Sequence, residues 1–176
     1  MGNEVTPQDR FYMYLGVWAR YAFLEGLVET QTEDALAGMN RAVKIWDTEH
    51  AKCESPIEAY LLAPVPFAVR AVFGGVVKVE CQREIGQYRV DLFFEAPQPN
   101  SCRGLIVECD GHDFHEKTKD QARRDKQRDR WFVSNGYQVL RFTGSEIWAN
   151  PFECAKEIDR CLKQILRSDA KSRETV

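Results

Sequence analysis

Residues 103–110 read RGLIVECD, a short apolar run that ends in the two carboxylates Glu108 and Asp110. Short apolar runs bordered by turn residues are typical of buried β-strands. Because side chains alternate along a strand, Glu108 and Asp110 are expected on one face and Cys109 on the other. The stretch therefore predicts a largely buried strand that presents acidic groups at its C-terminal end.

Residues 87–95 form a second apolar segment, which contains Asp91 among its apolar residues. Alternation predicts one face with Arg89, Asp91 and Phe93 and the opposite face with Tyr88, Val90, Leu92 and Phe94. If the two strands are hairpin neighbours, they lie about 4.8 Å apart. A register with Asp91 opposite Glu108 would then bring Asp91, Glu108 and Asp110 within reach of one cation.

Three carboxylates in an otherwise apolar sheet would be costly to ionise without a counter-charge. Oxygen ligands of this kind suit Mg²⁺ or Mn²⁺, and a bound ion can activate water and neutralise charge on a phosphate. Each acid taken alone is better explained as a solvent-facing strand residue or a polar strand end. The set of three, followed by a basic helix, favours a metal site.

The rest of the chain predicts an α/β protein with a mixed sheet. Helices are expected at residues 8–29, 33–49, after Ser55, at 117–135 and after Asn150, and strands at 76–82, 87–95, 103–110 and 137–142. The second helix is expected to bury Leu36, Met39, Val43 and Trp46 on one face. Ser55, Pro56 and Glu58 form a capping box that starts the third helix, which should end near Pro64 or Pro66.

The net charge of −3 conceals a basic segment in residues 117–130, where seven basic residues face three acids. A basic stripe on an acidic body suits contact with a polyanion such as nucleic acid. The alternative is a solvated helix face held by ion pairs, because Asp120 and Arg124 are four residues apart.

A chain of 176 residues with 44% hydrophobic and 29% charged residues fits one globular domain. No stretch approaches the roughly 20 apolar residues of a membrane span, and the first ten residues do not form a secretory signal. The six cysteines include no Cys-x-x-Cys pair, so they are predicted to be reduced and the protein to be cytoplasmic.

The ordered series of Glu58, Asp91 and the triplet ECD at 108–110 resembles the PD-(D/E)XK restriction-endonuclease-like nucleases. The continuation is similar to the branch that includes the very-short-patch mismatch-repair endonucleases. It comprises DGHDFH at 110–115, RD at 124–125 and 128–129, GY at 136–137, LRF at 140–142 and EI at 146–147. The resemblance covers about residues 53–165.

The resemblance implies an α-β-β-β-α-β core with a mixed sheet flanked by helices. The expected units are a helical extension over residues 1–51, the nuclease-like core over 52–167 and a flexible tail over 168–176. It also implies a Mg²⁺-dependent endonuclease, with Mn²⁺ as an alternative ion and DNA as substrate. Asp91 and Glu108 would bind the ion with the Cys109 carbonyl, and Asp110 and Glu58 would assist. Glu58 would act directly or through water, although its capping role explains it equally well.

One position departs from the family pattern, because Asp110 stands where these nucleases usually carry a lysine. His115 is the first candidate to orient the attacking water in its place, since the pKa of histidine is near neutral. Lys117, Lys119 and Gln82 are alternatives, and His112 is either part of the site or an ordinary loop residue. Arg141 is expected to contact phosphate or to pair with a buried acid such as Asp125.

Nucleic-acid contacts are predicted for Lys117, Lys119, Arg123, Arg124, Arg128 and Arg141. Three other functions remain open. One is an inactive nucleic-acid-binding module or an RNA-cleaving relative on the same fold. Another is a zinc hydrolase that uses Cys109, Asp110, His112 and His115. The third is an interaction protein that works through the aromatic helices of the first fifty residues, which are also a candidate homodimer surface.

Overall fold

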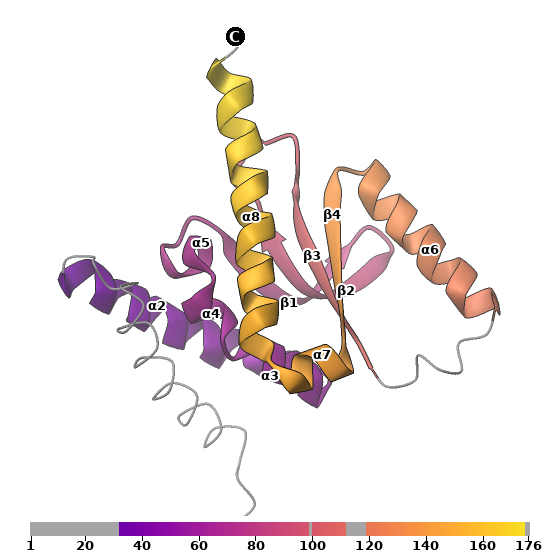
Figure 1. Cartoon of the computed structure of the whole chain (residues 1–176), viewed down its shortest axis with the longest axis horizontal. Helices are drawn as coiled ribbons and strands as arrows, with labels where there is room; N and C mark the ends of the chain where they lie inside the picture. The colour runs from indigo at the N-terminus through magenta and orange to yellow at the C-terminus, as the bar shows by residue number, and fades with distance from the viewer. Residues whose placement is uncertain (1–31, 99, 112–118, 175–176) are drawn as a thin grey trace, which may run out of the picture.

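A four-stranded mixed sheet with strand order β1-β2-β3-β4 lies at the centre of the fold (Figure 1). The computed structural model describes residues 32–98, 100–111 and 119–174. The strands are β1 (Lys78–Ile85), β2 (Tyr88–Glu95), β3 (Gly104–Asp110) and β4 (Tyr137–Thr143). The first three run antiparallel to one another, and β4 runs parallel to β3. The predicted α/β class with a mixed sheet is therefore confirmed.

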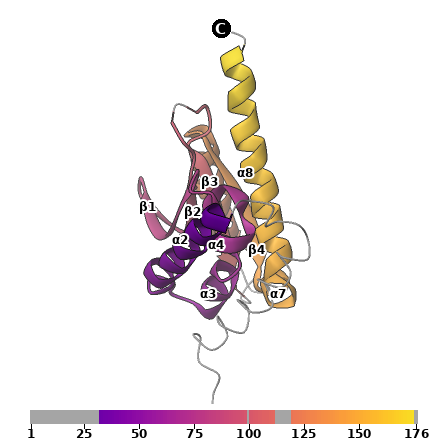
Figure 2. The same cartoon turned by 90° about the vertical axis from the view of Figure 1, so that its left-hand side faces the viewer.

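Helices cover both faces of this sheet, with α6 on one side and the others on the opposite side (Figures 1 and 2). They are α2 (Thr32–His50), α3 (Pro56–Leu62), α4 (Val65–Ala68), α5 (Arg70–Phe73), α6 (Lys119–Ser134), α7 (Gly144–Ala149) and α8 (Pro151–Glu174). Of these, α4, α5 and α7 were not predicted. A proline in the first turn of a helix removes no hydrogen bond, so Pro66 begins a short helix rather than ending one.

The start of α3 agrees with the predicted cap. The Ser55 hydroxyl accepts a hydrogen bond from the Glu58 backbone N–H at 3.4 Å. The helix ends at Leu62, two residues before Pro64, as expected from the steric effect of a proline on the residue before it. This cap fixes the backbone of Glu58, which contributes to the site described below.

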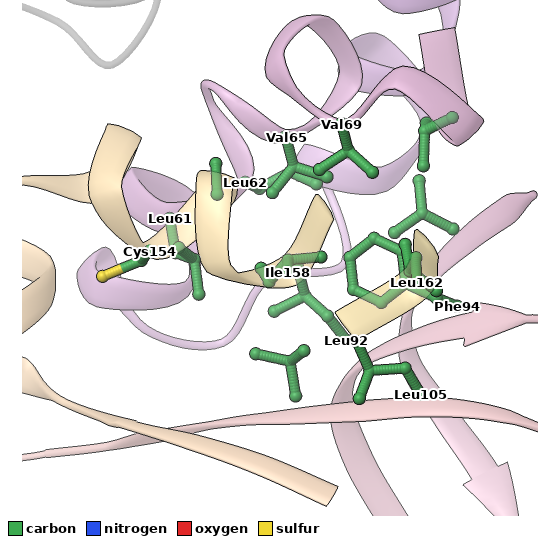
Figure 3. Packing of buried hydrophobic residues seen from close by; sticks show 14 of the residues in the cluster. Leu61, Leu62, Val65, Val69, Leu92, Phe94, Leu105, Cys154, Ile158 and Leu162 are labelled. Atoms are coloured by element: carbon green, nitrogen blue, oxygen red, sulfur yellow. The ribbon is translucent and has the colours of Figure 1, made fainter. Parts of the chain in front are cut away.

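The main cluster of buried apolar residues lies between the sheet and the helices opposite α6. Figure 3 shows part of it, with labels on Leu61, Leu62, Val65, Val69, Leu92, Phe94, Leu105, Cys154, Ile158 and Leu162. Helix α2 packs against α4, α5 and β1, and its Ala42 and Trp46 belong to this cluster. The part of the predicted extension that the structure describes is thus joined to the core.

One expectation about the helices needs correction. Val43 was predicted on the buried face of α2, but 37% of its surface is exposed, and Ala42 is buried in its place. Trp46 is buried and Met39 packs against the core, as predicted. Helix α8 runs through the predicted tail as far as Glu174, since no glycine or proline interrupts the sequence there, and the flexibility of residues 168–176 stays a prediction.

A smaller cluster of buried residues lies under α6 and contains Ile85, Val90, Phe93, Ile106 and Phe132. Tyr88 and Val90 pack here, whereas Leu92 and Phe94 pack in the main cluster. The prediction that these four residues share one face is therefore wrong. The two sets separate at Asp91.

The cause lies in the neighbouring strand, where Gln82 has a left-handed backbone with φ of 53°. Strand β1 changes faces at this point, since Cys81 packs in the main cluster and Ile85 in the smaller one. A non-glycine residue in this region costs of the order of 1–3 kcal/mol, and such strain is concentrated at functional sites. The distorted backbone of Gln82 therefore marks its neighbourhood, which includes Asp91, as a candidate functional site.

The six cysteines, all within the described residues, are free thiols as predicted. None of the described helices combines the length and the apolar character that a membrane span requires. The helix predicted at residues 8–29 lies outside the described residues. Of the candidate homodimer surface the structure therefore describes only the part on α2, and the dimer stays a prediction.

Candidate active site

Polar residues from neighbouring strands line up where the acidic end of β3 meets β2 and β4. The β2–β3 ladder pairs Leu92 with Val107, and the next position in this register sets Asp91 beside Glu108. Glu108 is paired in turn with Arg141 of β4. The register predicted from the sequence is therefore the one that the sheet adopts.

Gln82 holds the corresponding place on β1, between the residues that pair with Val90 and Leu92 of β2. We call Gln82, Asp91, Glu108 and Arg141 the polar row, because they cross all four strands at one level. A row of this kind interrupts strands that are otherwise apolar, so each of its members needs a polar partner.

Asp91 is half-buried, and its Oδ2 accepts a hydrogen bond from the Cys109 N–H at 2.7 Å. Burial raises the pKa of the Asp91 carboxyl above its ordinary value. The bond from Cys109 opposes this increase, while the negative charge of Glu58 adds to it. Asp91 is thus fixed against β3 in a place where its own charge is disfavoured.

Glu108 is 4% exposed, and the pKa of its carboxyl is raised to about 8, chiefly because the side chain is buried. The negative charge of Asp91 contributes to this increase, and the nearby Arg128 and Arg141 oppose it only in part. The raised pKa values of these two adjacent carboxyl groups mean that too little positive charge surrounds them to favour their ionised forms. A divalent cation, which prefers oxygen ligands, is a group that fits this environment.

The structure gives Glu108 a protein partner that the sequence did not reveal. From α6, the Nη2 of Arg128 donates to Glu108 Oε1 at 2.5 Å and to the Arg89 carbonyl at 2.6 Å. Arg128 had been predicted to contact the nucleic-acid backbone. It lies four residues before the buried Phe132, and this spacing, which places both on the same helix face, was the available signal.

Arg141 pairs with two acids. Its Nη1 lies 3.1 Å from Asp110 Oδ1, and its Nη2 lies 2.8 Å from Asp129 Oδ1. Burial disfavours its charge, but the hydrogen bond to Asp129 and the charge of Asp110 outweigh burial and raise the pKa of Arg141. The pairing that had been predicted with Asp125 is made with Asp129 instead, one helical turn further along α6.

The predicted convergence of three acids on one ion is not present in this form. Asp110 is engaged by Arg141, and within residues 32–98, 100–111 and 119–174 no three His, Cys, Asp or Glu side chains are arranged to hold a metal ion. What the structure assembles is the pair of Asp91 and Glu108. The reason is that Arg141, on the adjacent strand, supplies a closer counter-charge for Asp110.

Glu58 is buried and has three hydrogen-bond donors around its carboxylate. They are the Ser55 hydroxyl at 2.6 Å, the Gln82 side-chain amide at 2.8 Å and the Glu54 N–H at 2.9 Å. Glu58 therefore both caps α3 and bonds directly to a member of the polar row.

The zinc alternative depends on the Cys109 side chain. Burial and the charge of Asp91 raise the pKa of the Cys109 thiol, whereas a zinc ligand must be a thiolate. The side chain also packs against the main cluster. His112, His115 and Lys117 lie outside the described residues, as does the side chain of Lys119, so their roles stay predictions.

Arg123 and Arg124, two of the predicted nucleic-acid contacts, are exposed on α6 and form no ion pair with another described residue. Arg128 and Arg141 are instead half-buried in ion pairs with acids of the site. The basic segment therefore contains two kinds of charge. Arg123 and Arg124 face solvent, whereas Arg128 pairs with an acid of the site.

The family model REase_MTES_1575, which describes a restriction endonuclease-like family, matches residues 70–162, more than half of the chain. The chain belongs to this family, which confirms the resemblance to PD-(D/E)XK nucleases. Comparisons with curated proteins and with solved structures give no significant match.

Membership implies a nuclease in general, with nucleic acid as its substrate, in a family whose nucleases are usually metal-dependent. The matched residues include the whole polar row together with Arg128, whereas Glu58 precedes them.

Proposed function

We propose that this protein is a Mg²⁺-dependent endonuclease that hydrolyses phosphodiester bonds in DNA. In this proposal Asp91 and Glu108 bind the ion together with the Cys109 carbonyl, and Mn²⁺ is able to substitute. The observation that carries the proposal is the placement of the half-buried Asp91 beside the buried Glu108 on β2 and β3, in a chain of a nuclease family.

Each neighbouring residue has a part in this site. When bound, a divalent ion supplies an activated water and neutralises charge at the scissile phosphate. The Cys109 N–H orients the Asp91 carboxylate. Gln82, the member of the polar row on β1, is held in place by its hydrogen bond to Glu58. Outside the site, Arg123 and Arg124 would bind the phosphate backbone and position the strand without reading its sequence.

The test is a cleavage assay on supercoiled plasmid with Mg²⁺, extended to single-stranded DNA and RNA. Asp91→Asn and Glu108→Gln should each lower the rate by about 10³-fold, because each removes a ligand to an ion worth several kcal/mol in the transition state. Both should retain DNA binding. The matched control is Glu95→Gln, at the exposed end of β2, which should cleave like the original protein.

A nucleic-acid-binding module without activity is the second candidate. It is favoured by Asp110 at the lysine position and by Arg128, which forms an ion pair with Glu108 within the protein. Such a module would bind DNA without any turnover in Mg²⁺ or Mn²⁺. Undiminished cleavage by both Asp91→Asn and Glu108→Gln would instead remove the proposed site from the reaction.

A further inference from the structure

Among the described residues, the cation that reaches the pair of Asp91 and Glu108 from outside the sheet is Arg128. Arg128 extends from α6 and bonds to Glu108 Oε1 at 2.5 Å, whereas Arg141 of the polar row is engaged by Asp110 and Asp129. A phosphodiester adds further negative charge to this place during reaction. The positive charge of Arg128 is thus in direct contact with the acidic pair through Glu108.

The Arg128 side chain is held in one position by its surroundings. Its guanidinium lies 5.6 Å from the centre of the Phe132 ring and 5.9 Å from that of Tyr88. Its Nη2 also donates to the Arg89 carbonyl at 2.6 Å. Two aromatic rings and a backbone acceptor restrict the rotation of a long side chain, which lowers the entropy cost of presenting its charge.

Part of the guanidinium remains available as a hydrogen-bond donor. The Nε of Arg128 is buried and has no hydrogen-bond acceptor in the part of the chain that the structure describes. A buried charged donor without an acceptor is costly, and such groups are usually satisfied by water, an ion or a ligand. A water enclosed beside it would satisfy this donor, whereas the exposed part of the Arg128 side chain, 23% of its surface, is open to a substrate.

From these contacts we infer that Arg128 is a catalytic residue, whose guanidinium stabilises the negative charge that develops on the scissile phosphate while its Nη2 holds Glu108. The inference rests on the proposed function. The inference places on α6 the positive charge that these nucleases usually carry as a lysine on β3, because this chain has Asp110 at the lysine position. Arg128 therefore differs in role from Arg123 and Arg124, which face outward on the same helix.

This role predicts opposite effects on reaction and on ion binding. A cation that touches Glu108 repels a divalent ion from the same carboxylate, so its removal should tighten Mg²⁺ binding while slowing cleavage. A purely structural role would weaken both together. Arg128→Met is the variant of choice, because methionine keeps an unbranched apolar stem against Tyr88 and Phe132.

The experiment combines plasmid cleavage with calorimetric titration of the full chain by Mg²⁺ without DNA, at about pH 8.5. Arg128→Met should lower the cleavage rate constant at saturating DNA and Mg²⁺ by about 10²-fold and should bind Mg²⁺ more tightly. Arg128→Lys should recover at least about a tenth of the original rate. Arg160→Met, at an exposed position of α8, is the matched control and should change neither quantity.

Cleavage by Arg128→Met at the original rate, or parallel weakening of Mg²⁺ binding and cleavage, would overturn the inference. If Arg128→Met does not fold, Arg128→Lys decides, and a rate below about a hundredth of the original contradicts the role of the charge. Failure of the unaltered protein to cleave or to bind Mg²⁺ counts instead against the proposed function.

Discussion

The two faces of the sheet differ in what their side chains do. Among the described residues, the main cluster comprises 24 buried residues from β-strands and from helices opposite α6, whereas the cluster under α6 comprises five. The smaller cluster adjoins the polar row, through Arg128 on α6 and Glu108 on β3. One face therefore supplies most of the apolar burial that stabilises the fold, and the other combines modest burial with paired charges.

This difference implies that stability and activity should separate by face. Loss of buried apolar volume opposite α6 should unfold the protein without altering the acids directly. Loss of the carboxylate charge of Asp91 or Glu108 should alter the reaction with little cost in stability, because burial disfavours that charge. Each prediction below compares the two faces by a different measurement.

The largest effect is expected from Phe94→Ala in the main cluster. Phe94 is fully buried, so its truncation should lower the free energy of unfolding by about 3–5 kcal/mol. Phe132→Ala, in the smaller cluster, should fall at the low end of that range, because a thin layer collapses around a cavity more easily. Urea unfolding measures both, and a larger loss for Phe132→Ala would contradict the comparison.

A second effect concerns pH. The pKa of Glu108 is about 8 in the folded protein and near 4.5 when unfolded, so between these values the folded state binds more protons. Its contribution to stability is therefore present at low pH and is lost as pH rises through 8. In EDTA, Glu108→Gln should gain about 3 kcal/mol relative to the original protein between about pH 5 and pH 8.5. If the free energy of unfolding depends on pH in the same way in the two proteins, the raised pKa of Glu108 is contradicted.

A smaller effect is expected at the α3 cap. Ser55→Ala removes the acceptor for the Glu58 N–H and the hydroxyl that bonds to its carboxylate. The free energy of unfolding should fall by about 1 kcal/mol. Ser55→Thr keeps both bonds and serves as the control, so an equal loss in the two variants would show that the cap is not responsible.

The smallest effect on stability should come from the outward charges of α6. Arg123→Ala and Arg124→Ala should change the free energy of unfolding by less than about 0.5 kcal/mol. Each should reduce the slope of DNA affinity against salt concentration by about one. Titrations at several salt concentrations measure this slope, and an unchanged slope would remove both residues from the predicted backbone contact.

Much of the arrangement follows from local sequence signals. Apolar runs that each carry an acid predicted β2 and β3 and the register of Asp91 beside Glu108, and the Ser55 cap predicted the start of α3. These features depend on residues that are neighbours in the chain or in one ladder, where alternation and capping rules apply directly.

The missed features depend on contacts between distant segments. Nothing in the local sequence marks Gln82 for a left-handed backbone, since glycine is the usual residue there, so the change of faces at Asp91 could not be predicted. The choice of Asp129 over Asp125 by Arg141 depends on how α6 lies across the sheet. The bond from Arg128 to Glu108 depends on that same packing.

Divalent-ion binding by the full chain tests the central claim most directly, since it depends on Asp91 and Glu108 and on no assumption about the substrate. Titration with Mn²⁺, followed by electron paramagnetic resonance of the free ion, should show stoichiometric binding by the unaltered protein. That binding should persist in Glu95→Gln and be lost in Asp91→Asn and Glu108→Gln. Equal binding by all four proteins would contradict the claim that this acidic pair is the metal site.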